Sequence, residues 1–189
     1  DTENFKVNGG QGDDGQVLTS TGSGVAWEAA SGGVTFKTFG TASLMVGSSS
    51  TGTINAADSN TAVSTTAFAA LTTGDYNVAF GEESLDALTT GGGNTALGVA
   101  TLGALDTANN NTAVGISALT SNTSGTLNTS VGSDSMSGNT TGSYNVAVGS
   151  TALDANTSAS SNTAVGYAAL GANTTGTRNT ALGELALTG

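Results

Sequence analysis

Several residue types that commonly build functional sites are missing from this 189-residue chain. There is no cysteine, which excludes disulfides and thiolate metal sites. There is no histidine, so the commonest general base and the commonest metal ligand are both absent. Proline is absent as well, which suits a structure in which nearly every backbone N–H joins a hydrogen-bonded ladder. We therefore expect no metal and no cofactor.

Charged residues are scarce and mostly of one sign. Lys6, Lys37 and Arg178 are the only basic residues against 14 acidic ones, which gives a formal net charge of −11. Such a field repels a phosphate backbone, so we expect no nucleic-acid partner. No apolar run reaches the roughly 18 residues that a membrane-spanning helix needs, and no secretion signal is visible at the first residues. We expect no membrane insertion.

The chain has, in place of these features, a strict 17-residue repeat that fills its last three-quarters. Each copy begins with an asparagine and continues as a variant of N-T-A-V-G, and Ser43-Leu-Met-Val-Gly47 is a degenerate first copy. Fixed-period self-similarity without insertions predicts stacked, equivalent units. The repeating asparagines are Asn60, Asn77, Asn94, Asn111, Asn128, Asn145, Asn162 and Asn179.

The residue types within one copy favour a strand over a helix. Thr, Val, Gly and Asn form helices poorly, and one glycine in every copy would cost a helix about 1 kcal/mol each time. Helical solenoids also need about 33 residues or more per repeat. We therefore predict an all-β chain in which residues 43–189 form a parallel, two-sided β-roll solenoid. Each coil would contain two short strands and two turns.

Two neighbouring positions of the repeat, numbered from its asparagine, would face opposite sides of such a strand. Position 3 is alanine in most copies and predicts a flat outer face that contacts partner chains. Position 9, leucine in most copies, is expected to supply the second wall of the interior. Position 4 is large and apolar in every copy, and we expect it to form the core through Val63, Phe80, Leu97, Val114, Val131, Val148, Val165 and Leu182.

Two columns of the repeat contain asparagine. At position 1 the side-chain amides of successive copies can donate to and accept from each other, so we expect a structural ladder and not a binding site. Position 12 changes along the chain. It is Ile54, Leu71, Leu88 and Leu105 in the first copies and Asn122, Asn139, Asn156 and Asn173 in the later ones. A wider coil and a looser contact between subunits are both possible explanations.

The repeated phrases resemble those of known fibrous proteins. N-T-A-V-G-x-x-A-L is similar to the head repeats of trimeric autotransporter adhesins, and the phrase at residues 162–176 is similar to repeats of bacteriophage tail-fibre proteins. The resemblance covers residues 43–189 and implies a left-handed parallel β-roll that assembles as a homotrimer.

Residues 1–42 also resemble part of a fibre protein. The segment from Gly12 to Trp27 is similar to a G-x-x-G-Q-V-L-x-S-x-G-x-G-x-x-W element of phage fibres. It predicts two short strands, Gln16–Ser20 and Val25–Glu28, with Trp27 packed on Val17 and Leu18. We interpret residues 1–42 as an attachment or connector segment. A flexible glycine-rich linker is the alternative.

The acidic residues do not predict an active site. Glycosidases need two carboxyl groups about 5–9.5 Å apart. Asp86 and Asp154 occupy the same position of copies that lie four rungs apart, or about 19 Å at the spacing of stacked strands. Glu82 and Glu83 are neighbours on a polar stretch, and no calcium or phosphate-binding loop motif occurs. We therefore predict no catalytic residue.

The repeat and the resemblance together predict a non-enzymatic, homotrimeric structural fibre of a phage virion. One end would attach to other virion proteins, and the fibre would present a surface to a host receptor or glycan. Its localisation would be extracellular, on the virion. The alternatives are the head of a bacterial surface adhesin, a capsid-decorating fibre and a polysaccharide-degrading tailspike.

Overall fold

The computed structural model describes residues 16–20, 25–29, 35–37, 43–47 and 57–188. The chain divides into two compact units, residues 1–35 and 36–189. In the first unit, β1 (Gln16–Ser20) pairs antiparallel with β2 (Val25–Ala29), and Leu18 lies opposite Trp27. These are the two strands expected from the sequence, with β2 one residue longer. The turn between these strands lies outside the residues that the structure describes, and so does Ile54 of the repeat. The expected packing of the Trp27 side chain is not among the described features either.

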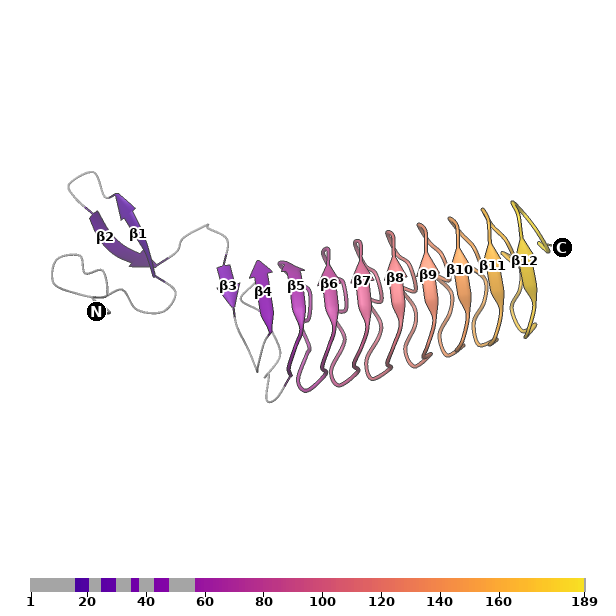
Figure 1. Cartoon of the computed structure of the whole chain (residues 1–189), viewed down its shortest axis with the longest axis horizontal. Coiled ribbons are helices and arrows are strands. Elements are labelled where there is room, and N and C mark those ends of the chain that lie inside the picture. Colours follow the sequence, from indigo (N-terminus) through magenta and orange to yellow (C-terminus); the bar gives the residue numbers. More distant parts are fainter. Residues whose placement is uncertain (1–15, 21–24, 30–34, 38–42, 48–56, 189) are drawn as a thin grey trace. The chain divides into compact units, whose positions relative to one another are not determined.

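The repeat forms one parallel sheet whose strands follow one another in chain order (Figure 1). Neighbouring strands pair at an offset of one repeat, so that Thr95 lies between Val78 and Thr112. The repeat therefore forms an all-β solenoid with 17-residue rungs, as the sequence predicts. Its strands are β3 (Thr35–Lys37), β4 (Leu44–Gly47), β5 (Thr61–Ser64), β6 (Val78–Phe80), β7 (Thr95–Leu97), β8 (Thr112–Val114), β9 (Thr129–Val131), β10 (Val146–Val148), β11 (Thr163–Val165) and β12 (Thr180–Leu182).

Each rung from β5 to β12 contains one strand, and the prediction of two strands per coil is wrong. The rest of the rung consists of turns that hydrogen-bond to the next rung, as when Leu85 N–H donates to the Thr101 carbonyl at 3.2 Å. Leucines at position 9 adopt left-handed backbone conformations, with φ of 50° at Leu85 and 54° at Leu102. This conformation is uncommon for a bulky residue. It turns the chain while the side chain enters the interior.

The interior of the solenoid contains the alanines at position 3 and the large residues at position 9. Ala79, Ala96 and Ala113 are completely buried, and so are Leu85 and Leu102 on the opposite wall. The two walls pack directly against each other in one hydrophobic cluster. Because leucines from the far wall fill this thin interior, a larger residue at position 3 would overpack it.

The large residues at position 4 lie on the outer face of the sheet, and the prediction that they form the core is wrong. Phe80 is 42% exposed and Val63 is 38% exposed, whereas the alanines beside them are buried. The reason is the alternation of side chains along a strand. The buried asparagine at position 1 shares its face with position 3, so position 4 must point outward. The corrected residues are Val63, Phe80, Leu97, Val114, Val131, Val148, Val165 and Leu182.

Glycine at position 5 is required by both its conformation and its neighbour. Gly81 has φ of 125°, and a Cβ on it would lie 2.4 Å from the carbonyl oxygen of Gly98 in the next rung. Any side chain there would force the rungs apart. The one described exception, Ser64, ends β5.

Candidate functional site

The asparagines at position 1 form the ladder that the sequence predicts. The Asn60 Oδ1 accepts two hydrogen bonds from Asn77, one from the backbone N–H at 2.8 Å and one from the side-chain Nδ2 at 3.0 Å. From Asn60 to Asn162, each Nδ2 also donates to a carbonyl on the far side of its own rung, as from Asn77 to the Gly91 carbonyl at 2.9 Å. The asparagines from Asn60 to Asn162 are buried. Since these amides already bond to one another and to the backbone, the column serves the fold and offers nothing to a ligand.

Ser43 takes the place of asparagine in the first copy. Its Oγ accepts the backbone N–H of Asn60 at 2.9 Å, which is the bond that an asparagine Oδ1 makes in later rungs. The hydroxyl also donates to the Ala57 carbonyl at 3.4 Å. A hydroxyl can donate and accept at once, so the degenerate first copy preserves the start of the ladder.

The asparagines at position 12 form a second interior ladder. Asn139 Nδ2 donates to Asn122 Oδ1 at 3.1 Å, and Asn156 Nδ2 donates to Asn139 Oδ1 at 2.8 Å. The same amides reach the backbone of their own rungs, as from Asn139 to the Gly142 carbonyl at 3.1 Å. Asn122, Asn139 and Asn156 are completely buried. The change at position 12 therefore replaces one kind of interior packing with another, and it does not mark a surface.

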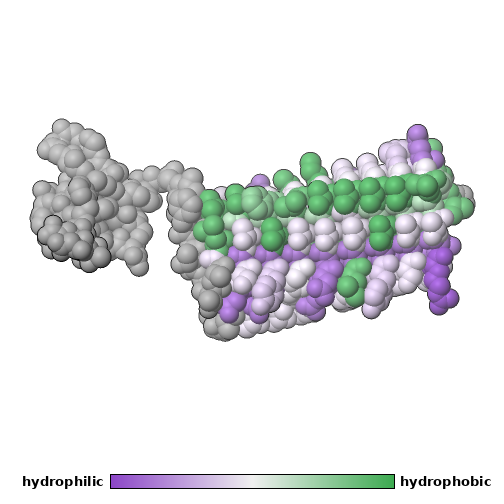
Figure 2. All heavy atoms as spheres, viewed as in Figure 1, coloured by the Kyte–Doolittle hydropathy of each residue, from purple (hydrophilic) through white to green (hydrophobic). Residues whose placement is uncertain are grey.

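An apolar stripe runs along the outer face of the sheet (Figure 2). We use this name for the position 4 side chains from Val63 to Leu182, which follow one another at the spacing of the strands. Position 2, on the same face, holds only threonine or valine from β5 to β12, so neither column carries a charge. An exposed apolar patch of this regularity is typical of a surface that contacts another protein. The sequence pattern indicated such a stripe but assigned it to the wrong column.

Within the described ranges, no group of three or more Asp and Glu residues is placed to hold a metal. Asp58 and Asp75 occupy the same position of adjacent rungs, where the Asp75 carboxylate accepts the backbone N–H of Asp58 at 2.7 Å. Partial burial raises the pKa of Asp86 above its ordinary value of 3.8, although hydrogen bonds from the backbone at Asp86 and Ala87 act against the rise. The Asp106 carboxylate accepts a short hydrogen bond from the Thr89 hydroxyl at 2.5 Å. Asp86 and Asp106 are single carboxylates on turns, without the converging partner that general acid–base chemistry requires.

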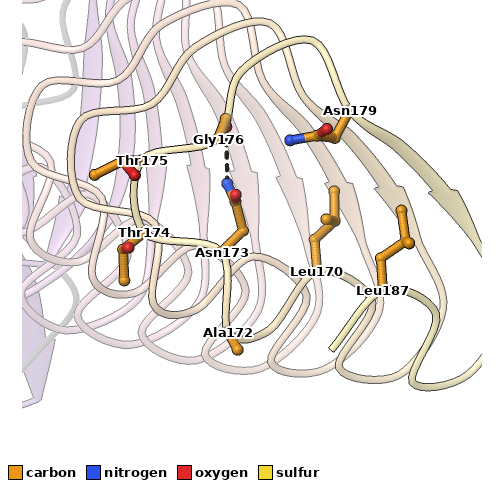
Figure 3. A pocket seen from close by; sticks show the side chains of 8 residues that line it. All are labelled: Leu170, Ala172, Asn173, Thr174, Thr175, Gly176, Asn179 and Leu187. Atoms are coloured by element: carbon orange, nitrogen blue, oxygen red, sulfur yellow. Dashed lines mark hydrogen bonds between the residues drawn. The ribbon is translucent and has the colours of Figure 1, made fainter. Parts of the chain in front are cut away.

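The last described rung of the solenoid contains a hollow of about 320 Å³ (Figure 3). Leu170, Asn173, Asn179 and Leu187 line it, and Asn173 Nδ2 donates to the Gly176 carbonyl at 3.0 Å. Leu187 is 60% exposed, whereas Leu153, in the same position of an inner rung, is completely buried. The hollow is thus the interior of the last rung, and its lining is that of the core.

The described parts of the chain contain no helix that is long and apolar enough to span a membrane. Comparison with known proteins adds no assignment, because no protein-family model, no curated protein and no solved structure matches this chain.

Proposed function

We propose that the protein is a non-enzymatic structural fibre of a phage virion, in which three copies associate through the apolar stripe. The observation that carries the proposal is the stripe itself, which is continuous, uncharged and mounted on a sheet with a hydrogen-bonded interior. Burying it between copies removes apolar surface from water. The contact column is position 4 and not, as the sequence suggested, position 3.

The finer features of the proposal come from the resemblance of the repeat to adhesin heads and phage tail fibres. They are a left-handed roll, a homotrimer, attachment of one end to other virion proteins and presentation of a surface to a host receptor or glycan. Each chain has a formal charge of −11. Three such chains would repel a bare anionic surface, so recognition would depend on a specific receptor.

Light scattering coupled to size-exclusion chromatography tests the association. We expect a particle with three times the chain mass of 18.1 kDa. Val131→Asp places a carboxylate in the middle of the stripe, and we expect it to shift the mass toward 18.1 kDa. Ser124→Asp, at an exposed residue outside the stripe, is the matched control and should leave the mass unchanged. A wild-type monomer would contradict the proposal.

An antibody raised against the solenoid distinguishes the two main settings. Immunogold labelling of virion appendages by electron microscopy supports the fibre proposal. Labelling of a bacterial cell surface without virions would replace it with the alternative, the head of a surface adhesin, which the same stripe would also serve.

A further inference from the structure

A longer repeat of four rungs is superimposed on the 17-residue repeat. Tyr76-Asn-Val-Ala79 returns as Tyr144-Asn-Val-Ala147, and the two phrases are four periods of the shorter repeat apart. Leu85-Asp-Ala87 returns as Leu153-Asp-Ala155 at the same separation. The intervening rungs have threonine in place of valine at position 2 and no tyrosine. Two rungs of the solenoid therefore differ from those between them by their tyrosine and valine, and these two rungs lie about 19 Å apart at the spacing of stacked strands.

In each of these two rungs, exposed side chains form a row that crosses the apolar stripe, and we call each row a band. The first band is Tyr76, Val78 and Phe80, and the second is Tyr144, Val146 and Val148. The residues between them, such as Asn77 and Ala79, are completely buried, so the band residues lie on the outer side. Tyr76 is 70% exposed and Tyr144 is 61% exposed.

The tyrosines occupy a backbone conformation that suits other residues better. Both have φ of 60°, in the left-handed region. The same position holds Gly93, Asn110 and the aliphatic Leu127 in the three intervening rungs. Glycine and asparagine adopt this conformation at the lowest cost. A large aromatic side chain is thus present at two levels where the backbone does not favour it.

A second copy of this chain is the occupant that fits the stripe best. A partner that contacts every rung must itself repeat at the strand spacing, and the stripe does so. From β5 to β12 the stripe extends about 34 Å, so an outer face five residues wide has an area of roughly 600 Å². A stable interface buries about 800 Å² on each partner, which is close to this area. The absence of charge on positions 2 and 4 removes the repulsion that two such acidic chains would otherwise meet there.

The stripe alone cannot fix how two copies align along their length. Apart from Phe80, its side chains are valine or leucine in every rung, so sliding one copy by one rung, about 4.8 Å, would lose few contacts other than those of Phe80 and of one end. The bands make the slipped alignments less favourable than the one in which equivalent rungs meet. A slide by one rung places Val78 against the level of Thr61 or Thr95 and Tyr76 against the level of Ser59 or Gly93.

We infer that the two Tyr–Val bands set the axial register between parallel copies of this chain. The inference rests on the proposed trimer, because three copies around a closed axis run parallel and bring equivalent residues to the same level. The register residues are Tyr76, Val78, Tyr144 and Val146.

Single cysteines test the register, since the chain has no cysteine of its own. Leu97→Cys and Val131→Cys chains are unfolded together, refolded as a mixture and oxidised. The two sites lie two rungs apart, about 10 Å, which is too far for a disulfide. We expect 97–97 and 131–131 crosslinks to exceed 97–131 crosslinks by at least about tenfold, the ratio that one or two buried apolar contacts provide.

The band variant carries Tyr76→Ser, Val78→Thr, Tyr144→Ser and Val146→Thr, which are residues that the same positions hold in other rungs. We expect a trimer in which the 97–131 crosslink rises to within about threefold of the others, because the contacts that set the ratio are gone. The control removes only the first band, and the second should still hold the register.

The outcomes separate this inference from the proposed function. A wild-type monomer overturns both. A trimer whose crosslinks stay homotypic in the band variant overturns the register role and leaves the trimer standing. Crosslinks of 97 to 131 without homotypic products in the wild type would indicate antiparallel copies and overturn the inference.

Discussion

Position 12 of the repeat is buried throughout the inner rungs, but it is leucine in the rungs before residue 111 and asparagine in the rungs after it. Leu71, Leu88 and Leu105 are completely buried in the first part, and Asn122, Asn139 and Asn156 are completely buried in the second. Burial of each leucine contributes about 1.5–3 kcal/mol. Each buried amide needs partners, since an unpaired polar group costs about 1–3 kcal/mol. Asparagine is tolerated in the core because the column supplies partners for its amides.

The boundary between the two parts shows how the amide ladder begins. Asn122 follows Leu105 and so has no asparagine below it in the column. Its side chain closes on Gly125 instead, accepting the backbone N–H at 3.0 Å and donating to the carbonyl at 2.9 Å. One glycine thus satisfies the first amide of the ladder, and the leucine stack can end without leaving that amide unpaired.

The largest effect is expected from placing an isolated asparagine in the leucine part. Leu88→Asn removes a fully buried leucine and introduces an amide between Leu71 and Leu105, where no ladder partner exists and only the backbone of Gly91 in its own rung can pair with it. We expect a loss of about 3 kcal/mol in the free energy of unfolding, measured by urea denaturation. Leu88→Met, the volume-conserving control, should cost less than about 1.5 kcal/mol. Equal midpoints for the two variants would show that position 12 does not depend on its neighbours.

A smaller and non-additive effect is expected from the reverse exchange. Asn139→Leu removes the acceptor for Asn156 and the donor to Asn122, and we expect a loss of about 1–2 kcal/mol. The triple variant Asn122→Leu, Asn139→Leu and Asn156→Leu extends the leucine stack and removes both partners of each bond between these rungs. We expect it to regain most of that loss in the same urea experiment. If the triple variant loses three times the single value, the ladder is not a cooperative unit.

The smallest effect concerns the pH dependence of stability at Asp86, which follows Leu85 in the leucine part. Burial raises its folded pKa above 3.8, so rising pH above about that value disfavours the folded state. Asp86→Asn should therefore be more stable than the wild type at pH 7, by less than about 1 kcal/mol because the carboxyl group is mostly solvent-screened. The difference should vanish below the ordinary carboxyl pKa.

The control for this titration is Asp154→Asn, the same position four rungs later, in the asparagine part. Thermal melts of both variants from pH 3 to pH 7, compared with the wild type, measure the effect. An Asp86→Asn variant that is less stable than the wild type at pH 7 would show that the backbone hydrogen bonds to the carboxylate outweigh its burial.

Much of the fold could be predicted from single columns of the repeat. The asparagines indicated a ladder because an amide is both donor and acceptor, and position 9 indicated an interior wall because it is apolar in nearly every rung. The strand β1 was located to the residue and β2 to within one residue by turn residues between apolar runs. Position 12 could not be interpreted, since its partner, the backbone of position 15 in the same rung, is brought close only by the turn between them.

The error at positions 3 and 4 has a physical cause. A rule that places large apolar residues inside assigned the valines to the core and the alanines to the surface. The parity of the asparagine column could have corrected it, since a buried Asn77 requires that Ala79 be buried too and that Val78 and Phe80 point outward. The threonines at position 2, such as Thr95, were the second available signal, because they alternate with buried residues.

The sequence by itself determined the period, the strand in each rung and the asparagine ladder, because each depends on residues repeated at one fixed spacing. Only the tertiary structure decided which face is inside and how position 12 accommodates asparagine. The inner face depends on the far wall of the coil, where leucines in left-handed turns leave room opposite them for small residues alone, alanine in most rungs and Ser130 in one. Position 12 depends on the turn that brings its amide to the backbone of position 15. The large apolar column is left on the outside as the apolar stripe.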